Sequence, residues 1–324
     1  MKILYAANNS ESSSISLKRF LDNLNKSHTI KIAAYKKATK YVKIDYLLDS
    51  LHNIFSPKEY GLNNENLQLY THEIKNFNPD LIISDLEYYT SYVANYLNIK
   101  LWQCSPYLLN YALPHKYKYQ SGVFKHYIKF FNNGAAITEH IKSLIHNSDK
   151  NYVYSNFGDL IDAPQISDNF EWIRPYHKIG RKSQICEHNI IASLPNNDKS
   201  ILNVLKKYND VVVFSDFIDE QYRNIVLKRI ELEDEYYCNL HNSNIFICNG
   251  EINLLADAFY NEKYSIIFPN FNEPDCLLNS IFSDFFGSGK IIFNRNDDIS
   301  KYVGTSVVVN ANNIKYLHEK IEEL

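Results

Sequence analysis

Short apolar runs alternate with segments of helical spacing along most of this chain. Residues 2–7 form such a run, and apolar residues then recur every three or four positions between 17 and 24. Short apolar runs of this kind are typical of strands buried in a parallel sheet whose two faces are covered by helices. The pattern therefore predicts an α/β fold.

The predicted elements fall into two successive sets, separated by a polar stretch at 177–187 that is typical of an interdomain linker. This division predicts two Rossmann-like domains, 1–176 and 188–324, facing each other across a cleft. In the first domain we expect strands at 2–7, 29–35, 81–84, 100–104, 134–138, 152–155 and 170–176, helices at 67–77, 89–97 and through 144, and a polar loop at 10–14. In the second we expect strands at 189–193, 211–215, 245–248, 265–268 and 290–293, with helices at 199–208, 219–229, 252–261, 277–286 and 314–324.

Composition narrows the class of protein. The 324 residues suffice for two domains that each bury a core, and the net charge of −3 provides no general basic field for nucleic acid. Five scattered cysteines without CxxC spacing argue against a disulfide framework or a zinc site, and favour a reducing, cytoplasmic compartment. No apolar run reaches the roughly 20 residues of a membrane span. One local feature stands apart: lysines interleave with aromatic residues over 116–131, which fits an amphipathic segment or, less specifically, contact with DNA or membrane.

The most informative stretch lies in the second domain. The predicted strand at 245–248 leads through Asn249, Gly250 and Glu251 into a helix that opens at Ile252 or Asn253. The N–H groups and the positive dipole end of such a helix suit a diphosphate, and a glycine lets the backbone approach it closely. The turn therefore predicts an anion site at the carboxyl edge of a sheet.

A carboxylate follows on the same helix. Asp257 lies four residues beyond Asn253 and so on the same face, where it could accept hydrogen bonds from ribose hydroxyls. The alternative interpretation of the whole stretch is an ordinary strand–turn–helix packing unit.

The segments NGEINLLADAF and IIFPNFNEPDCLLNSIFSDFFGSGK, at 249–259 and 266–290, resemble the nucleotide-sugar motif of GT-B glycosyltransferases of the MurG-like and UDP-glycosyltransferase group. The resemblance implies that residues 250–253 hold the diphosphate, that Asp257 takes the ribose and that Asp275 reads sugar hydroxyls. Pro269 matches the proline at the strand end of that motif and Asn279 its asparagine. This chain departs from the motif at three positions, where Glu251 replaces a glycine, Leu254 a hydroxyl residue and Cys276 a glutamine.

Two further segments carry the same resemblance. NPDLIISDLE at 78–87 is similar to the PDLVISD strand of these enzymes, and a short polar loop follows at 103–106. HNIIASLPNN at 188–197 resembles the start of the second domain in poorly characterised archaeal and bacterial members, and adds Ser193 to the donor-binding candidates.

The general base is the open question in the first domain. Relatives often have a GxGH loop after the first strand, but this chain has Asn-Asn-Ser-Glu-Ser at 8–12. Asp85 and Glu87 follow a strand at the carboxyl edge, where a base could remove the acceptor proton, although such a residue often serves only as a helix cap. Glu11 and His115 are the other candidates, and an unusual acceptor or a loss of activity would also fit.

The resemblance implies a cytoplasmic glycosyltransferase, either hexosyl or pentosyl, with an acceptor-binding first domain and a donor-binding second domain. It would move a sugar from a nucleotide-diphosphate sugar, expected to be a UDP-sugar, to an acceptor hydroxyl, with inversion and without metal or further cofactor. A modified DNA base or a cell-surface glycan or lipid could be the acceptor. The alternatives are a nucleotide-sugar 2-epimerase and a non-catalytic nucleotide-sugar-binding protein.

Overall fold

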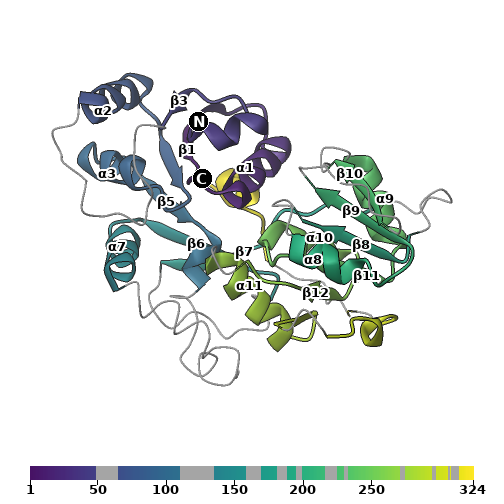
Figure 1. Ribbon diagram of the computed structural model, residues 1–324. Coiled ribbons are helices and arrows are strands. Elements are labelled where there is room, and N and C mark those ends of the chain that lie inside the picture. Colours follow the sequence, from purple (N-terminus) through teal and green to yellow (C-terminus); the bar gives the residue numbers. More distant parts are fainter. Residues whose placement is uncertain are drawn as a thin grey trace. The chain divides into compact units, whose positions relative to one another are not determined.

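A computed structural model describes residues 1–48, 65–109, 135–157, 169–180, 188–194, 199–215, 225–229, 233–270, 274–293, 297–305, 307 and 314–324. Its chain divides into two compact units, Met1–Tyr176 with Asn313–Leu324, and His177–Asn312. Each unit is built around one sheet of parallel strands with helices packed against it (Figure 1), so the predicted α/β class with two Rossmann-like domains is confirmed.

The first unit contains a seven-stranded sheet in the order β3-β2-β1-β4-β5-β6-β7. The strands are β1 Lys2–Ala6, β2 Thr29–Ala34, β3 Tyr46–Leu47, β4 Leu81–Ser84, β5 Leu101–Cys104, β6 Lys150–Tyr154 and β7 Phe170–Ile173. The helices are α1 Glu11–Asn23, α2 Glu65–Phe77, α3 Tyr88–Tyr96, α7 Ala135–His146 and α12 Leu317–Glu322, with 3-10 turns η1 Lys36–Lys40 and η3 Pro106–Leu108.

The second unit contains a six-stranded sheet in the order β10-β9-β8-β11-β12-β13. The strands are β8 Ile190–Ser193, β9 Val211–Ser215, β10 Ile225–Arg229, β11 Ile245–Cys248, β12 Ser265–Ile267 and β13 Gly289–Ile291. The helices are α8 Lys199–Leu205, α9 Glu233–Asn242, α10 Ile252–Tyr260 and α11 Pro274–Phe285, with the 3-10 turn η5 Ser300–Tyr302.

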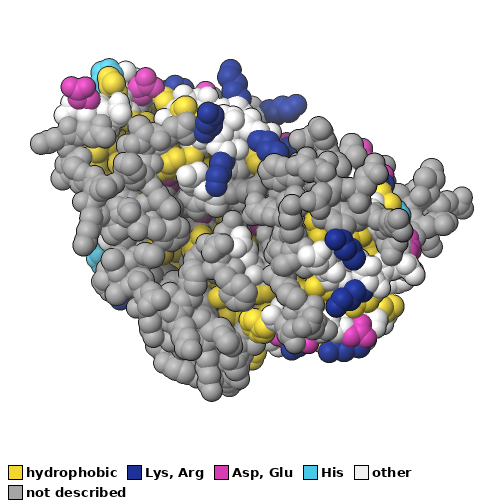
Figure 2. Space-filling model, in the orientation of Figure 1, with side chains coloured by type: hydrophobic (Ala, Val, Ile, Leu, Met, Phe, Trp, Pro, Cys, Tyr) yellow, Lys and Arg dark blue, Asp and Glu magenta, His cyan; other side chains and the backbone are white. Residues whose placement is uncertain are grey.

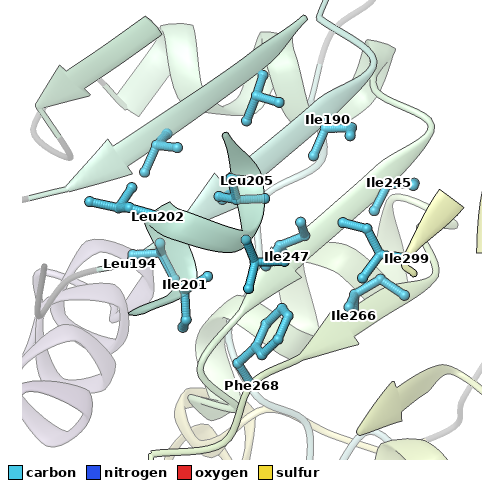
Figure 3. Close-up of a cluster of buried hydrophobic side chains, with 14 of the residues drawn as sticks. Ile190, Leu194, Ile201, Leu202, Leu205, Ile245, Ile247, Ile266, Phe268 and Ile299 are labelled. Carbon is cyan, nitrogen blue, oxygen red and sulfur yellow. The ribbon is translucent and has the colours of Figure 1, made fainter. Parts of the chain in front are cut away.

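Neighbouring residues of each strand point to opposite faces of the second sheet. Both faces are buried because helices pack against them. On one face Ile190, Ile247 and Phe268 pack with the apolar side of α8 (Figure 3). On the other face Ile191 and Phe246 belong to a cluster that includes residues of α9 and α10. Central strands covered on both sides read as unbroken apolar runs, which is why the sequence predicted them well.

The two sheets share one topological feature. In each, the first three strands of the unit run outward to one edge of the sheet, and the fourth strand pairs with the other side of the first. This reversal point lies between β1 and β4 in the first unit and between β8 and β11 in the second. Ligands of open α/β sheets bind outside the carboxyl ends of the strands at this reversal point. The residues that follow these four strands are therefore the ones to examine for function.

Three predicted elements are wrong. Residues 11–14 of the predicted loop are the first turn of α1, because the Ser10 hydroxyl accepts a hydrogen bond from the Ser13 amide at 3.0 Å and caps the helix. Residues 135–138 of the predicted strand begin α7. Residues 225–229, expected at the end of a helix, form the strand β10, in which Ile225 is buried and Val226 is exposed as the alternation of an edge strand requires. Helix α9 and the short strand β3 were not predicted.

The unit boundaries differ from the predicted ones at two places. The last residues belong to the first unit, where Lys320 forms an ion pair with Glu171 at 2.8 Å and the Arg174 amide donates to the Lys315 carbonyl at 3.0 Å. The start of the predicted linker belongs to the second unit, because the Lys178 amide donates to a carboxylate of α10 at 3.0 Å. In the described part of the chain, no helix combines the length and the apolar character needed to cross a bilayer.

Candidate functional site

The same turn follows the strand beside the reversal point in both units. In the first unit it is Asp85-Leu86-Glu87 after β4, and in the second it is Asn249-Gly250-Glu251 after β11. The middle residue has a left-handed backbone in both, with φ of 51° for Leu86 and 91° for Gly250. The glutamate then caps the following helix in both. The turns are therefore one local structure used twice.

Glu251 occupies the anion position at the start of α10. Its carboxylate accepts hydrogen bonds from the backbone amides of Asn253 and Leu254, both at 3.1 Å, and from the Asn253 side-chain amide at 2.5 Å. The side chain is buried, and the Asn249 side-chain oxygen accepts from the Glu251 amide at 3.1 Å. The amides expected to hold a diphosphate thus already bind a carboxylate of the protein itself.

Gly250 is required by packing, whether or not a ligand binds. A Cβ at this position would lie 2.1 Å from the Ser280 hydroxyl oxygen and 2.4 Å from the Cys276 carbonyl oxygen, both on α11. Both distances are far shorter than a real contact, so only glycine lets α11 pack against the turn. The donor-binding role expected for Gly250 stays a prediction, whereas the packing reason for the glycine was not foreseen from the sequence.

Asp257 lies in the protein interior. The residue is fully buried, one carboxylate oxygen accepts from the Lys178 amide at 3.0 Å, and the other accepts from the Tyr237 hydroxyl at 3.1 Å. These contacts join the beginning of the second unit to α10 and α9. They argue against the ribose-binding role predicted for Asp257, because its acceptor atoms face protein donors.

Two polar side chains near this reversal point lack protein partners. The Ser193 hydroxyl, at the end of β8, and the Asn279 side-chain nitrogen, on α11, are buried and have no hydrogen-bond partner. Ser193 was a predicted donor-binding residue and stays one. Ile252 is buried at the first position of α10, and Asp275 lies in the first turn of α11 with its side chain outside the described part of the structure.

Asp85 is the most perturbed carboxyl group of the first reversal point. It is 3% exposed, and burial raises its pKa from 3.8 to about 6, against the opposing effect of hydrogen bonds from the hydroxyls of Ser105 and Ser13. The Ser13 oxygen accepts from the Asn8 amide at 3.1 Å, which leaves the hydroxyl proton of Ser13 to donate to Asp85. One carboxylate oxygen of Asp85, Oδ1, has no protein partner.

Asp85 and the two serines that contact it follow neighbouring strands. Ser13 lies on the helix after β1, Asp85 follows β4 and Ser105 follows β5, and these strands are adjacent in the sheet. Asn8, in the loop that follows β1, donates from its side chain to the Asp85 carbonyl at 3.2 Å and is buried. Sequence reasoning missed both serines and the role of Asn8: Asn8 and Ser105 directly follow predicted strands, whereas Ser13 fell in the predicted loop at 10–14.

Glu87 is a helix cap, so the alternative interpretation of this predicted catalytic residue is the one that fits. Its carboxylate accepts from the amides of Tyr89 at 3.2 Å and Thr90 at 2.7 Å, and from the Tyr35 hydroxyl at 3.2 Å. The residue is fully buried, and this burial raises its pKa. Because Glu87 is fully buried and its carboxylate already accepts three hydrogen bonds, it is not placed to take a proton from an acceptor hydroxyl.

The remaining candidates are not described at the level of side chains. The side chain of Glu11 is outside the described part of the structure, and so are His115 and the lysine and aromatic residues of 116–131. Among the described residues no group of three or more His, Cys, Asp or Glu side chains could hold a metal ion.

Comparison with known proteins places the fold. No model of a protein family matches the chain, and no curated protein matches its sequence. Solved structures do match: spinosyn forosaminyltransferase SpnP has 12% identity and a TM-score of 0.60, covering 94% of this chain and 88% of that one. The calicheamicin glycosyltransferase CalG4 has 11% identity and a TM-score of 0.57, covering 90% and 85%. The S. aureus MnaA–UDP co-structure has 13% identity and a TM-score of 0.50, covering 83% and 79%. At these identities the likeness concerns the fold, and the chain has the two-unit Rossmann-like fold of GT-B glycosyltransferases.

Proposed function

We propose that this protein is a glycosyltransferase that moves a sugar from a nucleotide-diphosphate sugar to an acceptor hydroxyl, with Asp85 as the general base. The observation that carries the proposal is Asp85 itself: a buried carboxyl with a raised pKa and one unpartnered oxygen, at the reversal point of the first sheet. Perturbed carboxyl groups at such positions are typical of acid–base sites. The UDP-sugar donor, inversion, metal independence and the cytoplasmic location belong to the same proposal.

The position of Asp85 suits proton removal. A group with a pKa of about 6 is mostly ionised at neutral pH and still basic enough to accept a proton from a hydroxyl as that hydroxyl reacts. The acceptor O–H proton would pass to Oδ1 of Asp85 while the acceptor oxygen bonds to the anomeric carbon. The bond from that carbon to the diphosphate breaks, and the diphosphate leaves with the electron pair.

The test is product formation by Asp85→Asn. We expect the variant to lose turnover by about 10²- to 10⁴-fold, measured by mass spectrometry of products from a panel of nucleotide sugars offered with DNA, oligosaccharide and lipid acceptors. Its donor affinity should stay unchanged in calorimetric titrations. Asp22→Asn, an exposed position on α1, is the matched control and should retain full activity. Full activity in Asp85→Asn would refute the assignment of the base.

One observation favours a second candidate, a non-catalytic nucleotide-sugar-binding protein. The Glu251 carboxylate accepts hydrogen bonds from the backbone amide of Asn253, which the resemblance assigns to the diphosphate, and from that of Leu254 beside it. Binding of UDP-sugars without turnover on any acceptor would support this candidate over the transferase. The same donors incubated without acceptor and followed by NMR test for a 2-epimerase, because a new sugar epimer would accumulate.

A further inference from the structure

The charge of the chain is unevenly distributed. Residues 1–48 contain nine Lys or Arg and three Asp or Glu, a net charge of +6, whereas the whole chain has −3. Four of these lysines stand close together at Lys36, Lys37, Lys40 and Lys43, on η1 and the residues that follow it, and all four are exposed. We call these four residues the lysine segment. Figure 2 shows several Lys and Arg side chains over the upper part of the first unit, and others elsewhere on this face.

The lysine segment lies at the functional edge of the first sheet. It directly follows β2, and the carboxyl ends of the parallel strands β2, β1 and β4 share one edge. Tyr35, the residue before the segment, donates from its hydroxyl to Glu87, two residues beyond Asp85, at 3.2 Å. A molecule whose hydroxyl reached Asp85 would therefore meet positive charge at the neighbouring strand end.

We propose that the lysine segment binds the phosphates of a phosphodiester polymer, and that the acceptor is of this class. The second part rests on the proposed transferase function, whereas the binding itself does not. Along a 3-10 helix Lys36 and Lys40 are about 8 Å apart, a separation that suits successive phosphates of a chain better than one small anion. The spread of charge thus favours a polymer.

A membrane surface fits the segment less well. Basic surface segments that bind bilayers place large apolar side chains beside their lysines. Here Ala38 is buried beneath the turn, Tyr41 and Val42 are half-buried, and the exposed residues of 36–43 are the four lysines and Thr39. The segment therefore presents charge without an apolar anchor.

The experiment measures binding of the full chain to fluorescent single-stranded DNA across a series of KCl concentrations, without donor. Each phosphate contact contributes about −0.7 to the slope of log K against log salt for single strands. We expect the variant with all four lysines of the segment changed to Gln to bind more weakly, with a slope shallower by about 3. Inorganic polyphosphate should displace the DNA, because the proposed contacts are to phosphate.

The matched control changes Lys75, Lys206, Lys207 and Lys301 to Gln, four exposed lysines elsewhere in the chain, and removes the same charge. It should leave the slope unchanged. Equal slopes in the two variants, DNA that polyphosphate fails to displace, or binding to anionic vesicles without binding to either polymer would each overturn the proposal. Because no turnover is measured, a failure here is distinct from a failure of the transferase assay.

Discussion

Replacing Asp85 by Asn should change how the stability of the first unit depends on pH. Folding raises the pKa of this carboxyl from 3.8 to about 6, so the folded state holds the proton more tightly than the unfolded state. The wild-type protein therefore loses stability through this group as pH rises from about 4 to 6, and above pH 6 the full cost of the buried charge is present. The Asn variant has no such dependence.

The size of the effect follows from the shift of about two pKa units, which corresponds to about 3 kcal/mol at high pH. Between pH 5 and pH 8 the difference in unfolding free energy between variant and wild type should grow by about 1.4 kcal/mol in favour of the variant. The change with pH is the informative quantity, because the loss of the carboxylate's hydrogen bonds to Ser13 and Ser105 in the variant affects the unfolding free energy equally at the two pH values.

Urea unfolding followed by tryptophan fluorescence measures this directly. The chain has two tryptophans, Trp102 on β5 and Trp172 on β7, and both belong to the first unit. A difference between variant and wild type that is the same at pH 5 and pH 8 would refute the raised pKa of Asp85, and with it the main physical reason for assigning a base at this position.

Three further substitutions test the contacts of the two turns. Ser13→Ala removes a hydroxyl that lowers the pKa of Asp85, so in the same urea assay the stability of this variant should keep falling to a higher pH than that of the wild type. An unchanged pH profile would contradict that hydrogen bond. Glu87→Ala should destabilise the first unit by about 1 to 2 kcal/mol through loss of the cap of α3, and an unchanged urea midpoint would contradict the capping role. Gly250→Ala should destabilise the second unit by more than a left-handed backbone alone, which costs about 1 to 2 kcal/mol, as measured by unfolding followed by circular dichroism. Gly287 has a φ of 74° and open space around it, so Gly287→Ala should show the backbone cost alone.

The sequence predicted what depends on local pattern. Buried central strands such as β4 and β11 are unbroken apolar runs, so the two sheets and their order along the chain could be inferred. The edge strand β10 could not be inferred. Its sequence, Ile-Val-Leu-Lys-Arg, is not an unbroken apolar run, and its two basic residues are typical of the last turn of a helix.

The roles of the candidate site residues depended on tertiary structure to a greater degree. The spacing of Asn253 and Asp257 correctly placed both on one helix face, but spacing cannot show that this face is turned toward the interior. Ser13 and Ser105 are far apart in sequence and meet Asp85 only because β1, β4 and β5 are adjacent in the sheet. The Glu251 cap was also beyond sequence reasoning, since the direction of that carboxylate decides its role.

Helix α12 makes the first unit discontinuous, with a consequence for synthesis on the ribosome. Leu317 and Ile321 are buried in that unit, and Tyr316 stacks on Tyr176 with ring centroids 5.4 Å apart. This last piece of the first unit emerges only after the whole second unit has been made. Although domains of most proteins complete their folding in order from the amino terminus, here the second unit can finish first, and the first unit acquires α12 only after residues 177–312 have been synthesised.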